Sequence, residues 1–162
     1  MNPVKGDVVV LPQHGLCLVI GRRVVTYGLK RSECLSLKVM SNDHVVTLPV
    51  VNLSERNLRA PITLADFDAV LAGLAERKKS TAKSWSRRFK RNQALLHSGH
   101  ILEVVAVVRD LSVWSQKNPL SAAEQTMYDR AYTNLIAEMK HAATDFDIDV
   151  VGLVANALLS PR

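Results

Sequence analysis

The amino-acid sequence predicts an α+β protein, in which a small β-barrel or curved sheet is followed by an all-α region of about five helices. Up to residue 49, apolar residues form short β-branched runs that end at glycine, proline or polar turns, which is typical of strands. From residue 63 onward, they recur at spacings of three and four, which indicates helices. Pro61 and the polar segment at residues 54–57 interrupt both patterns. We therefore expect two domains, over residues 1–55 and 62–162.

Short strands are expected throughout the first domain. Each is rich in β-branched or alternating apolar residues and stops at a turn signal, such as Gly21, Gly28 or the polar stretch at residues 41–44. The predicted strands cover residues 7–11, 16–20, 23–27, 34–40 and 45–48. So many strands with tight turns in about 45 residues favour a highly curved sheet or a barrel.

Helices with apolar faces are expected in the second domain. The third of them is apolar nearly all round, so we expect it to be the central, buried helix. The sequence Ser98-Gly99 stops the second helix before it. The predicted helices begin at Thr63, run over about residues 84–97 and 101–115, begin at the capping box Ser121-x-x-Glu124, and run from Thr144 or Asp145 through Leu159.

Composition excludes several classes of protein. The chain has 162 residues, of which 48% are hydrophobic and 22% charged, so it suits a globular protein and is too apolar for a disordered one. No apolar run approaches the roughly 18 residues that span a bilayer, and no secretory signal is visible at its start. Two cysteines are too few for a disulfide scaffold. We therefore expect an intracellular protein, located in the cytoplasm.

Basic residues are concentrated in one segment. Residues 77–91 hold eight lysines and arginines and no acidic residue, whereas the whole chain has a net charge of only +6. Such a local concentration is the pattern expected of a polyanion-binding surface, because each neutralised phosphate releases condensed counterions. A solvated, flexible linker accounts for a charge run equally well.

No group of residues resembles a catalytic or metal site. The sequence lacks a phosphate-binding glycine loop and the histidine spacings of metal-binding helices. His97 and His100 are better read as solvated residues near a helix end than as a metal pair, and Cys17 and Cys34 as two buried thiols. The alternating acids at residues 145–149 suit a helix start better than a calcium loop. We expect no enzyme activity, metal or cofactor.

The segment that contains Trp85 combines aromatic and basic side chains on one predicted helix. Trp85 and Phe89 fall on the same face, while Arg87, Arg88 and Arg91 form a separate arc with Lys90 nearby. Both aromatic residues can be core anchors with the basic arc in solvent. Alternatively, a ring in the first turn among guanidinium groups is what a site that stacks on bases requires.

Two other aromatic residues give a contrast. Trp114 ends the apolar helix without basic neighbours, so we assign it to the core. Tyr27, beside Gly28 at the end of a strand, is either an exposed contact for a partner or the edge of the sheet's own core.

Several motifs together resemble one family. Val4-Lys-Gly-Asp-Val-Val-Val10 and Pro12-x-His14-Gly15 resemble the opening of the CarD/CdnL family of bacterial transcription regulators, which the polymerase-interacting module of transcription-repair coupling factors shares. A second group of motifs resembles the C-terminal half of that family. These motifs are Trp85-Ser-Arg-Arg-Phe-Lys90, Ser98-Gly99, Val105-Ala-Val-Val-Arg-Asp-Leu111 and Leu120-Ser-x-x-Glu124.

The resemblance implies a Tudor-like N-terminal domain that docks on the β subunit of RNA polymerase. It also implies a helical domain that meets promoter DNA, without reading a sequence, at the upstream edge of the melted region. There Trp85 would enter the minor groove as a wedge and stabilise the open complex. We expect a monomer associated with the nucleoid. An adaptor that binds a protein partner without contacting DNA is the alternative.

The resemblance implies that Arg87, Arg88 and Lys90 lie along the DNA backbone, and it assigns no individual residue to the polymerase contact. In the family, strands that meet the polymerase often present basic residues where Val25 and Thr47 stand here. The DNA-binding set that we predict is Trp85, Arg87, Arg88, Lys90, Arg91 and Lys83. The polymerase-binding set that we predict is Arg22, Arg23, Tyr27, Lys38 and Thr47.

Overall fold

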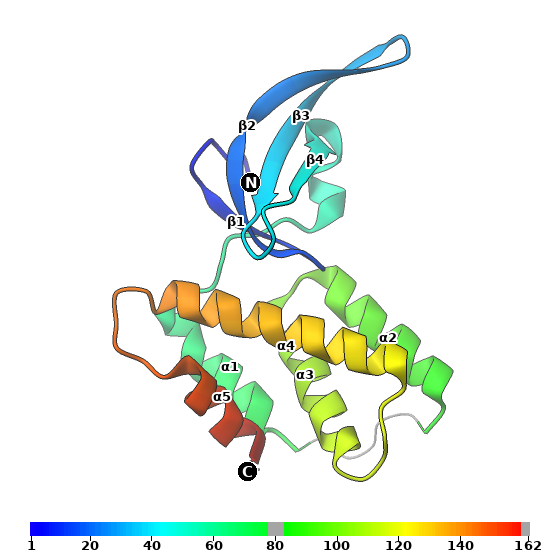
Figure 1. The fold of residues 1–162 in the computed structure, drawn as a ribbon, viewed down its shortest axis with the longest axis vertical. Coiled ribbons are helices and arrows are strands. Elements are labelled where there is room, and N and C mark those ends of the chain that lie inside the picture. Colours follow the sequence, from blue (N-terminus) through cyan, green and yellow to red (C-terminus); the bar gives the residue numbers. More distant parts are fainter. Residues whose placement is uncertain (78–82, 160–162) are drawn as a thin grey trace. The chain divides into compact units, whose positions relative to one another are not determined.

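The computed structural model describes residues 1–77 and 83–159, and the chain divides into two compact units, Met1–Pro61 and Ile62–Arg162. Of the basic segment at residues 77–91, Lys78 and Lys79 lie outside the described residues. Within the described residues, the first unit holds the strands and the second holds five α-helices (Figure 1). The predicted α+β class, with a small curved sheet ahead of an all-α region, is confirmed.

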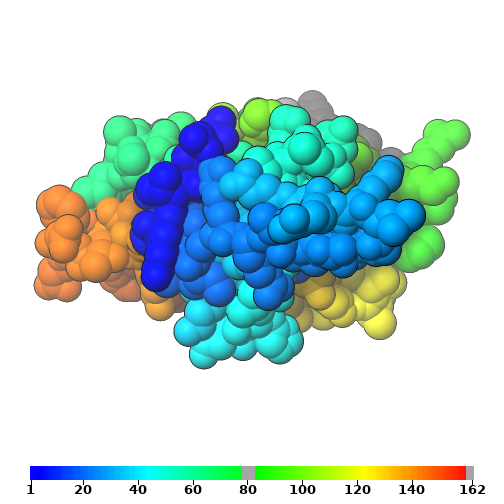
Figure 2. Space-filling model, turned by 90° about the horizontal axis from the view of Figure 1, so that it is seen from above, coloured from blue at the N-terminus to red at the C-terminus, as the bar shows by residue number. Residues whose placement is uncertain are grey.

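The first unit is an antiparallel meander that curls on itself. Its strands pair in the order β1-β2-β3-β4, with a Tudor-like half-barrel as the result. The strands are β1 (Val8–Leu11), β2 (Gly15–Tyr27), β3 (Lys30–Val39) and β4 (Val45–Pro49), and two short 3₁₀ helices follow, η1 (Val50–Asn52) and η2 (Ser54–Arg56). Apolar side chains from all four strands fill its core: Val9, Leu11, Cys17, Val19, Leu35, Leu37, Val39 and Leu48. Figure 2 shows this unit from above, with β2 and β3 in blue across its surface.

The number of strands differs from the prediction. The runs at residues 16–20 and 23–27 are one strand, β2, because Gly21 does not end it but sits in a β-bulge, where the register shifts between Val19 and Gly21. At the far end, Tyr27 pairs with Lys30 and Gly28 takes a positive φ of 59°, which closes a tight hairpin. β2 and β3 therefore form one long hairpin.

In the second unit, three helices pack against α3 and a fourth packs against two of those three. The 3₁₀ turn η3 (Leu64–Asp66) leads into α1 (Phe67–Ala75), which is followed by α2 (Trp85–Ser98), α3 (Ile101–Ser115), α4 (Ala122–Ala142) and α5 (Val150–Leu159). α3 packs against α1, α2 and α4, and α5 packs against α1 and α4 (Figure 1). Buried residues of α3 include Val105, Val108 and Leu111. The third helix is thus the central element that its apolar pattern predicts.

Capping residues set the start of α4 and the end of α2. Ser121 and Glu124 form the predicted capping box at the start of α4, and Gly99, with φ of 75°, ends α2 in the left-handed conformation that favours glycine. The start of the last helix was placed too early by the prediction. α5 begins at Val150, and Asp149, rather than Thr144 or Asp145, accepts a hydrogen bond from the backbone N–H of Gly152 at 3.0 Å.

Both cysteines are buried, as predicted, and neither forms a disulfide. They do not face each other, because Cys17 pairs with Val39 and Cys34 pairs with Arg23. Burial raises the pKa of the Cys17 thiol to about 11, although a backbone hydrogen bond at Leu11 opposes that shift. This thiol therefore stays protonated at neutral pH and packs as a small apolar group.

The described residues hold neither a membrane-spanning helix nor a cluster of metal-ligating side chains. No helix within residues 1–77 and 83–159 has the length and apolar character needed to cross a membrane. In the same ranges, no three histidine, cysteine, aspartate or glutamate side chains gather as a metal site would need.

Candidate nucleic-acid interface

Trp85 is held at the first turn of α2 with much of its indole in solvent. The residue is 47% exposed. Its ring stacks on that of Phe89, one turn further along, with centroids 5.3 Å apart and planes inclined by 20°. Its Nε1–H donates a hydrogen bond to the Oγ of Ser121 at 2.9 Å. Trp85 is therefore an ordered, accessible ring and not a sealed core residue.

Several exposed lysines and arginines lie near Trp85 in the sequence. Lys83, Arg87 and Lys90 are exposed, and none of them has an ion-pair partner among the residues that the structure describes. Arg91 is half exposed and pairs with Asp110 at 3.6 Å. We call Trp85 and these four cations, which are its neighbours in the chain, the Trp85 surface: Trp85, Lys83, Arg87, Lys90 and Arg91.

Arg88 does not belong to that surface, contrary to the prediction. Its side chain is only 6% exposed, and its Nε donates to Glu124 of α4 at 2.5 Å. Its guanidinium group also lies over the ring of Trp114, 4.0 Å from the centroid. The prediction that Trp114 has no basic neighbour is therefore wrong as well, and Trp114 is half buried rather than sealed in the core. Arg88 ties α2 to α3 and α4.

Glu124 is the most buried carboxylate in this part of the fold, at 1% exposure. Burial by itself raises the pKa of Glu124, but hydrogen bonds from Arg88 and Ser121 and the positive charge of Arg88 outweigh it, so the pKa is lowered. The carboxylate thus stays charged at neutral pH. It accepts from the backbone N–H of Ser121 at 3.2 Å while it neutralises Arg88.

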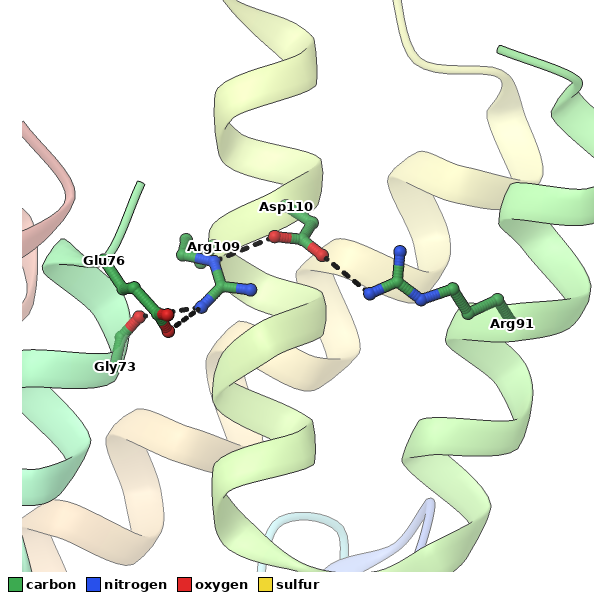
Figure 3. A network of polar contacts seen from close by, with 5 residues as sticks. All are labelled: Gly73, Glu76, Arg91, Arg109 and Asp110. Atoms are coloured by element: carbon green, nitrogen blue, oxygen red, sulfur yellow. Dashed lines mark hydrogen bonds and ion pairs between the residues drawn. The ribbon is translucent and has the colours of Figure 1, made fainter. Parts of the chain in front are cut away.

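A second polar network supports Arg91 (Figure 3). Asp110 of α3 accepts from the Nε of the buried Arg109 at 2.8 Å and pairs with Arg91 of α2. Arg109 also donates to the carbonyl oxygen of Gly73 at 3.2 Å and to Glu76 at 3.0 Å, both near the end of α1. Charges of alternating sign therefore run from α1 through α3 to α2.

Sequence reasoning missed this network. The sequence did contain one signal: Arg109 and Asp110 are adjacent in a helix that is apolar nearly all round. Charged side chains that are buried in such a helix need partners of opposite charge. Which partners they find depends on how α1 and α2 pack against α3, and no local pattern contains that information.

The residues predicted to bind polymerase divide between two faces of the sheet. Side chains alternate along a strand, and directly opposed residues share a face. The register therefore places Arg23, Tyr27, Lys38 and Thr47 on one face. There Arg23 donates from Nη2 to the Oγ1 of Thr47 at 3.0 Å across β3. We call these four residues the outer sheet face.

Arg22 lies on the opposite face, because it stands directly across from Leu35, a core residue. The bulge before it changes the alternation of β2, so a reading that assumes a straight strand cannot place it. Its guanidinium pairs with Glu33 at 3.4 Å and also donates to Asn2 and to the carbonyl oxygen of Pro3. Arg22 thus holds the N-terminal segment against the sheet.

Comparisons with known proteins agree with this division of the chain. Residues 4–62 match the family model described as the CarD-like/TRCF RID domain, and residues 69–149 match the model described as CarD, C-terminal domain. A relative from Bacillus subtilis (strain 168), named "Putative transcription factor YdeB", is 24% identical over 135 residues, which are 83% of this chain and 88% of the relative.

Proposed function

The chain belongs to the CarD family of transcription regulators, and we propose that it joins RNA polymerase to promoter DNA and stabilises the open complex. In this proposal, the first unit binds the β subunit of the polymerase. The Trp85 surface of the second unit meets the DNA at the upstream edge of the melted region. CarD-type regulators are not enzymes.

The half-exposed indole of Trp85 carries the DNA part of the proposal. An aromatic ring can replace a stacking partner where neighbouring base pairs have come apart, and an apolar wedge in the minor groove favours such a step. Lys83, Arg87 and Lys90 lie close in the chain and supply charges for phosphates. A ring that binds melted DNA better than closed duplex shifts the melting equilibrium by that difference, and about 1.4 kcal/mol is tenfold.

The exposed cations favour binding that does not depend on the DNA sequence. Phosphate contacts position a protein on DNA but carry no base information. The Trp85 surface offers lysines and arginines, with no asparagine or glutamine among its members for paired hydrogen bonds to adenine. Specificity for the promoter would come from the polymerase and from the melted step.

The match to the RID domain supports the polymerase part, because RID domains of CarD and TRCF proteins interact with RNA polymerase. We propose the outer sheet face, with Arg23, Tyr27, Lys38 and Thr47, as the contact surface on the β subunit. Tyr27 is exposed at the tip of the long hairpin, and Arg23 is oriented by Thr47. Arg22 lies on the core-facing side, so we exclude it from this surface.

Promoter melting with purified polymerase tests the proposal. Trp85→Ala should shorten the lifetime of the open complex to that without the protein, because the ring is removed while the fold keeps its core. Phe146→Ala is the matched control: its ring is also exposed in the second unit, yet it precedes α5 and lies outside the Trp85 surface. It should leave the lifetime unchanged.

Three outcomes would count against the proposal. An open-complex lifetime that Trp85→Ala leaves unchanged would show that the Trp85 ring does not act as a wedge. Loss of the folded state in that variant, seen by thermal unfolding, would show that the ring is structural. Retained polymerase binding without any footprint on promoter DNA would support a protein-binding adaptor instead.

A further inference from the structure

We infer that Ser121 and Glu124, at the start of α4, are positioning residues that hold the Trp85 indole ready for DNA. The inference rests on the proposed function and adds to it how the ring is oriented. Trp85 lies 36 residues before Ser121 in the chain, and the hydrogen bond between them is the direct link. Neither Ser121 nor Glu124 belongs to the predicted DNA-binding set.

The start of α2 needs such support. Ser84, its N-cap residue, makes no side-chain capping hydrogen bond, and no acidic residue lies in the first turn. Arg87 and Arg88 instead place positive charges near the positive end of the helix dipole, which disfavours this turn. Trp85 stands in the same turn, so the indole would be poorly fixed if α2 were left to itself.

Two contacts from α4 supply the missing support. The Oγ of Ser121 accepts from the indole Nε1–H at 2.9 Å and from the backbone N–H of Glu124 at 3.1 Å. The carboxylate of Glu124 binds Arg88, three residues after Trp85. The first turn of α2 is therefore joined to the first turn of α4 through one neutral contact at the ring and one ion pair behind it.

These contacts leave the ring accessible. Trp85 is still 47% exposed as a residue, although its ring is hydrogen-bonded and stacked on Phe89. Binding normally costs free energy to immobilise a free side chain, and a ring that is already ordered avoids that cost. The geometry therefore favours a pre-oriented ring over one that must first be released from a closed position.

Replacement of Ser121 by glycine is the central test. Glycine is nearly as good an N-cap as serine but has no hydroxyl for the indole, so α4 should keep its start while Trp85 loses its acceptor. We expect the open-complex lifetime to fall about fivefold, which equals about 1 kcal/mol, the usual contribution of one hydrogen bond. Ser121→Thr keeps a hydroxyl and should restore the lifetime to within about twofold.

Thr63→Gly is the matched control. Thr63 forms a capping box with Asp66 ahead of α1. This box is not among the contacts of Trp85 described above, which are with Ser121 and Phe89. It should leave the open-complex lifetime unchanged. A second readout is the Trp85 indole N–H resonance in an ¹⁵N NMR spectrum, identified by its loss in Trp85→Phe. It should shift and exchange faster with solvent in Ser121→Gly but not in Thr63→Gly.

The outcomes separate this inference from the proposed function. If Trp85→Ala shortens the lifetime but Ser121→Gly leaves it unchanged, the positioning role is overturned and the wedge stands. A longer lifetime in Ser121→Gly would also overturn it, because the contact would then restrain the ring. If Trp85→Ala itself has no effect, the proposed function fails together with the inference, whatever the NMR spectrum shows.

Discussion

Arg87 and Arg88 are neighbours in the first turn of α2, but their guanidinium groups have different surroundings. Arg87 is exposed, whereas Arg88 is buried between Glu124 and the ring of Trp114. A charge in solvent is free to meet a phosphate. A charge whose carboxylate partner is buried instead stabilises the fold, and the partner is left unpaired if that charge is removed.

Alanine at these two positions should therefore give opposite results. Arg88→Ala should lower the free energy of unfolding by about 3–5 kcal/mol, because Glu124 loses its buried partner. Arg87→Ala should change it by less than about 0.5 kcal/mol, while the slope of log K against log salt for DNA binding becomes shallower by about 0.9. Urea unfolding and salt-dependent DNA titrations measure the two effects. Equal loss of stability in both variants would contradict this assignment.

The difference between these arginines also marks the limit of sequence reasoning about the site. Helical spacing placed Trp85 and the arginines that follow it on one helix, and α2 confirms this. It assigned Arg88 to solvent, because the residue that buries it, Glu124, lies on another helix. Only the packing of α2 against α4 decides that contact, and the same holds for Arg91 and Asp110.

At the scale of secondary-structure elements, the prediction was right where local capping residues set the boundary of a helix. The capping box at Ser121 and the glycine at position 99 set the start of α4 and the end of α2 as predicted. Gly21 misled the prediction because glycine serves both to end a strand and to form a bulge. Pairing with β3 on both sides of Gly21 favours the bulge.

The capping box of α4 also predicts how stability depends on pH. Because the pKa of Glu124 is lower in the folded protein than in the unfolded chain, its carboxylate stabilises the fold above roughly pH 4.3, the ordinary pKa of glutamate. That contribution is lost as the pH falls through the lower, folded pKa. Glu124→Gln should be less stable than the wild type at pH 7, and the difference should narrow as the solution becomes more acidic.

Urea unfolding of both proteins at a series of pH values from 7 downward measures this narrowing. The glutamine side chain binds no proton in this pH range. Position 124 therefore adds nothing to the pH dependence of the stability of Glu124→Gln. A stability difference that stays constant across the series would show that the buried pair does not titrate with folding.

For the whole molecule, the proposed activity depends on two surfaces being carried by one chain. The outer sheet face belongs to Met1–Pro61 and the Trp85 surface to Ile62–Arg162, and each unit has a hydrophobic core of its own. In the proposed function, binding of the first unit to polymerase would confine the second unit near the DNA. Its effective concentration there is far above that of a free fragment. A weak, sequence-independent DNA contact is then sufficient.

Separate fragments, 1–61 and 62–162, should therefore fail to replace the intact chain at equal concentration. Fragment 62–162 should bind DNA with the salt dependence of the intact protein, a slope of about −3 to −4 for roughly four phosphate contacts, because the cations of the Trp85 surface all lie within it. The mixed fragments should prolong the open complex only at concentrations about a hundredfold or more above those of the intact chain. Open-complex lifetimes measured against protein concentration give this ratio. If fragment 62–162 alone matched the intact chain, DNA binding would be sufficient by itself and the first unit would have no part in the effect.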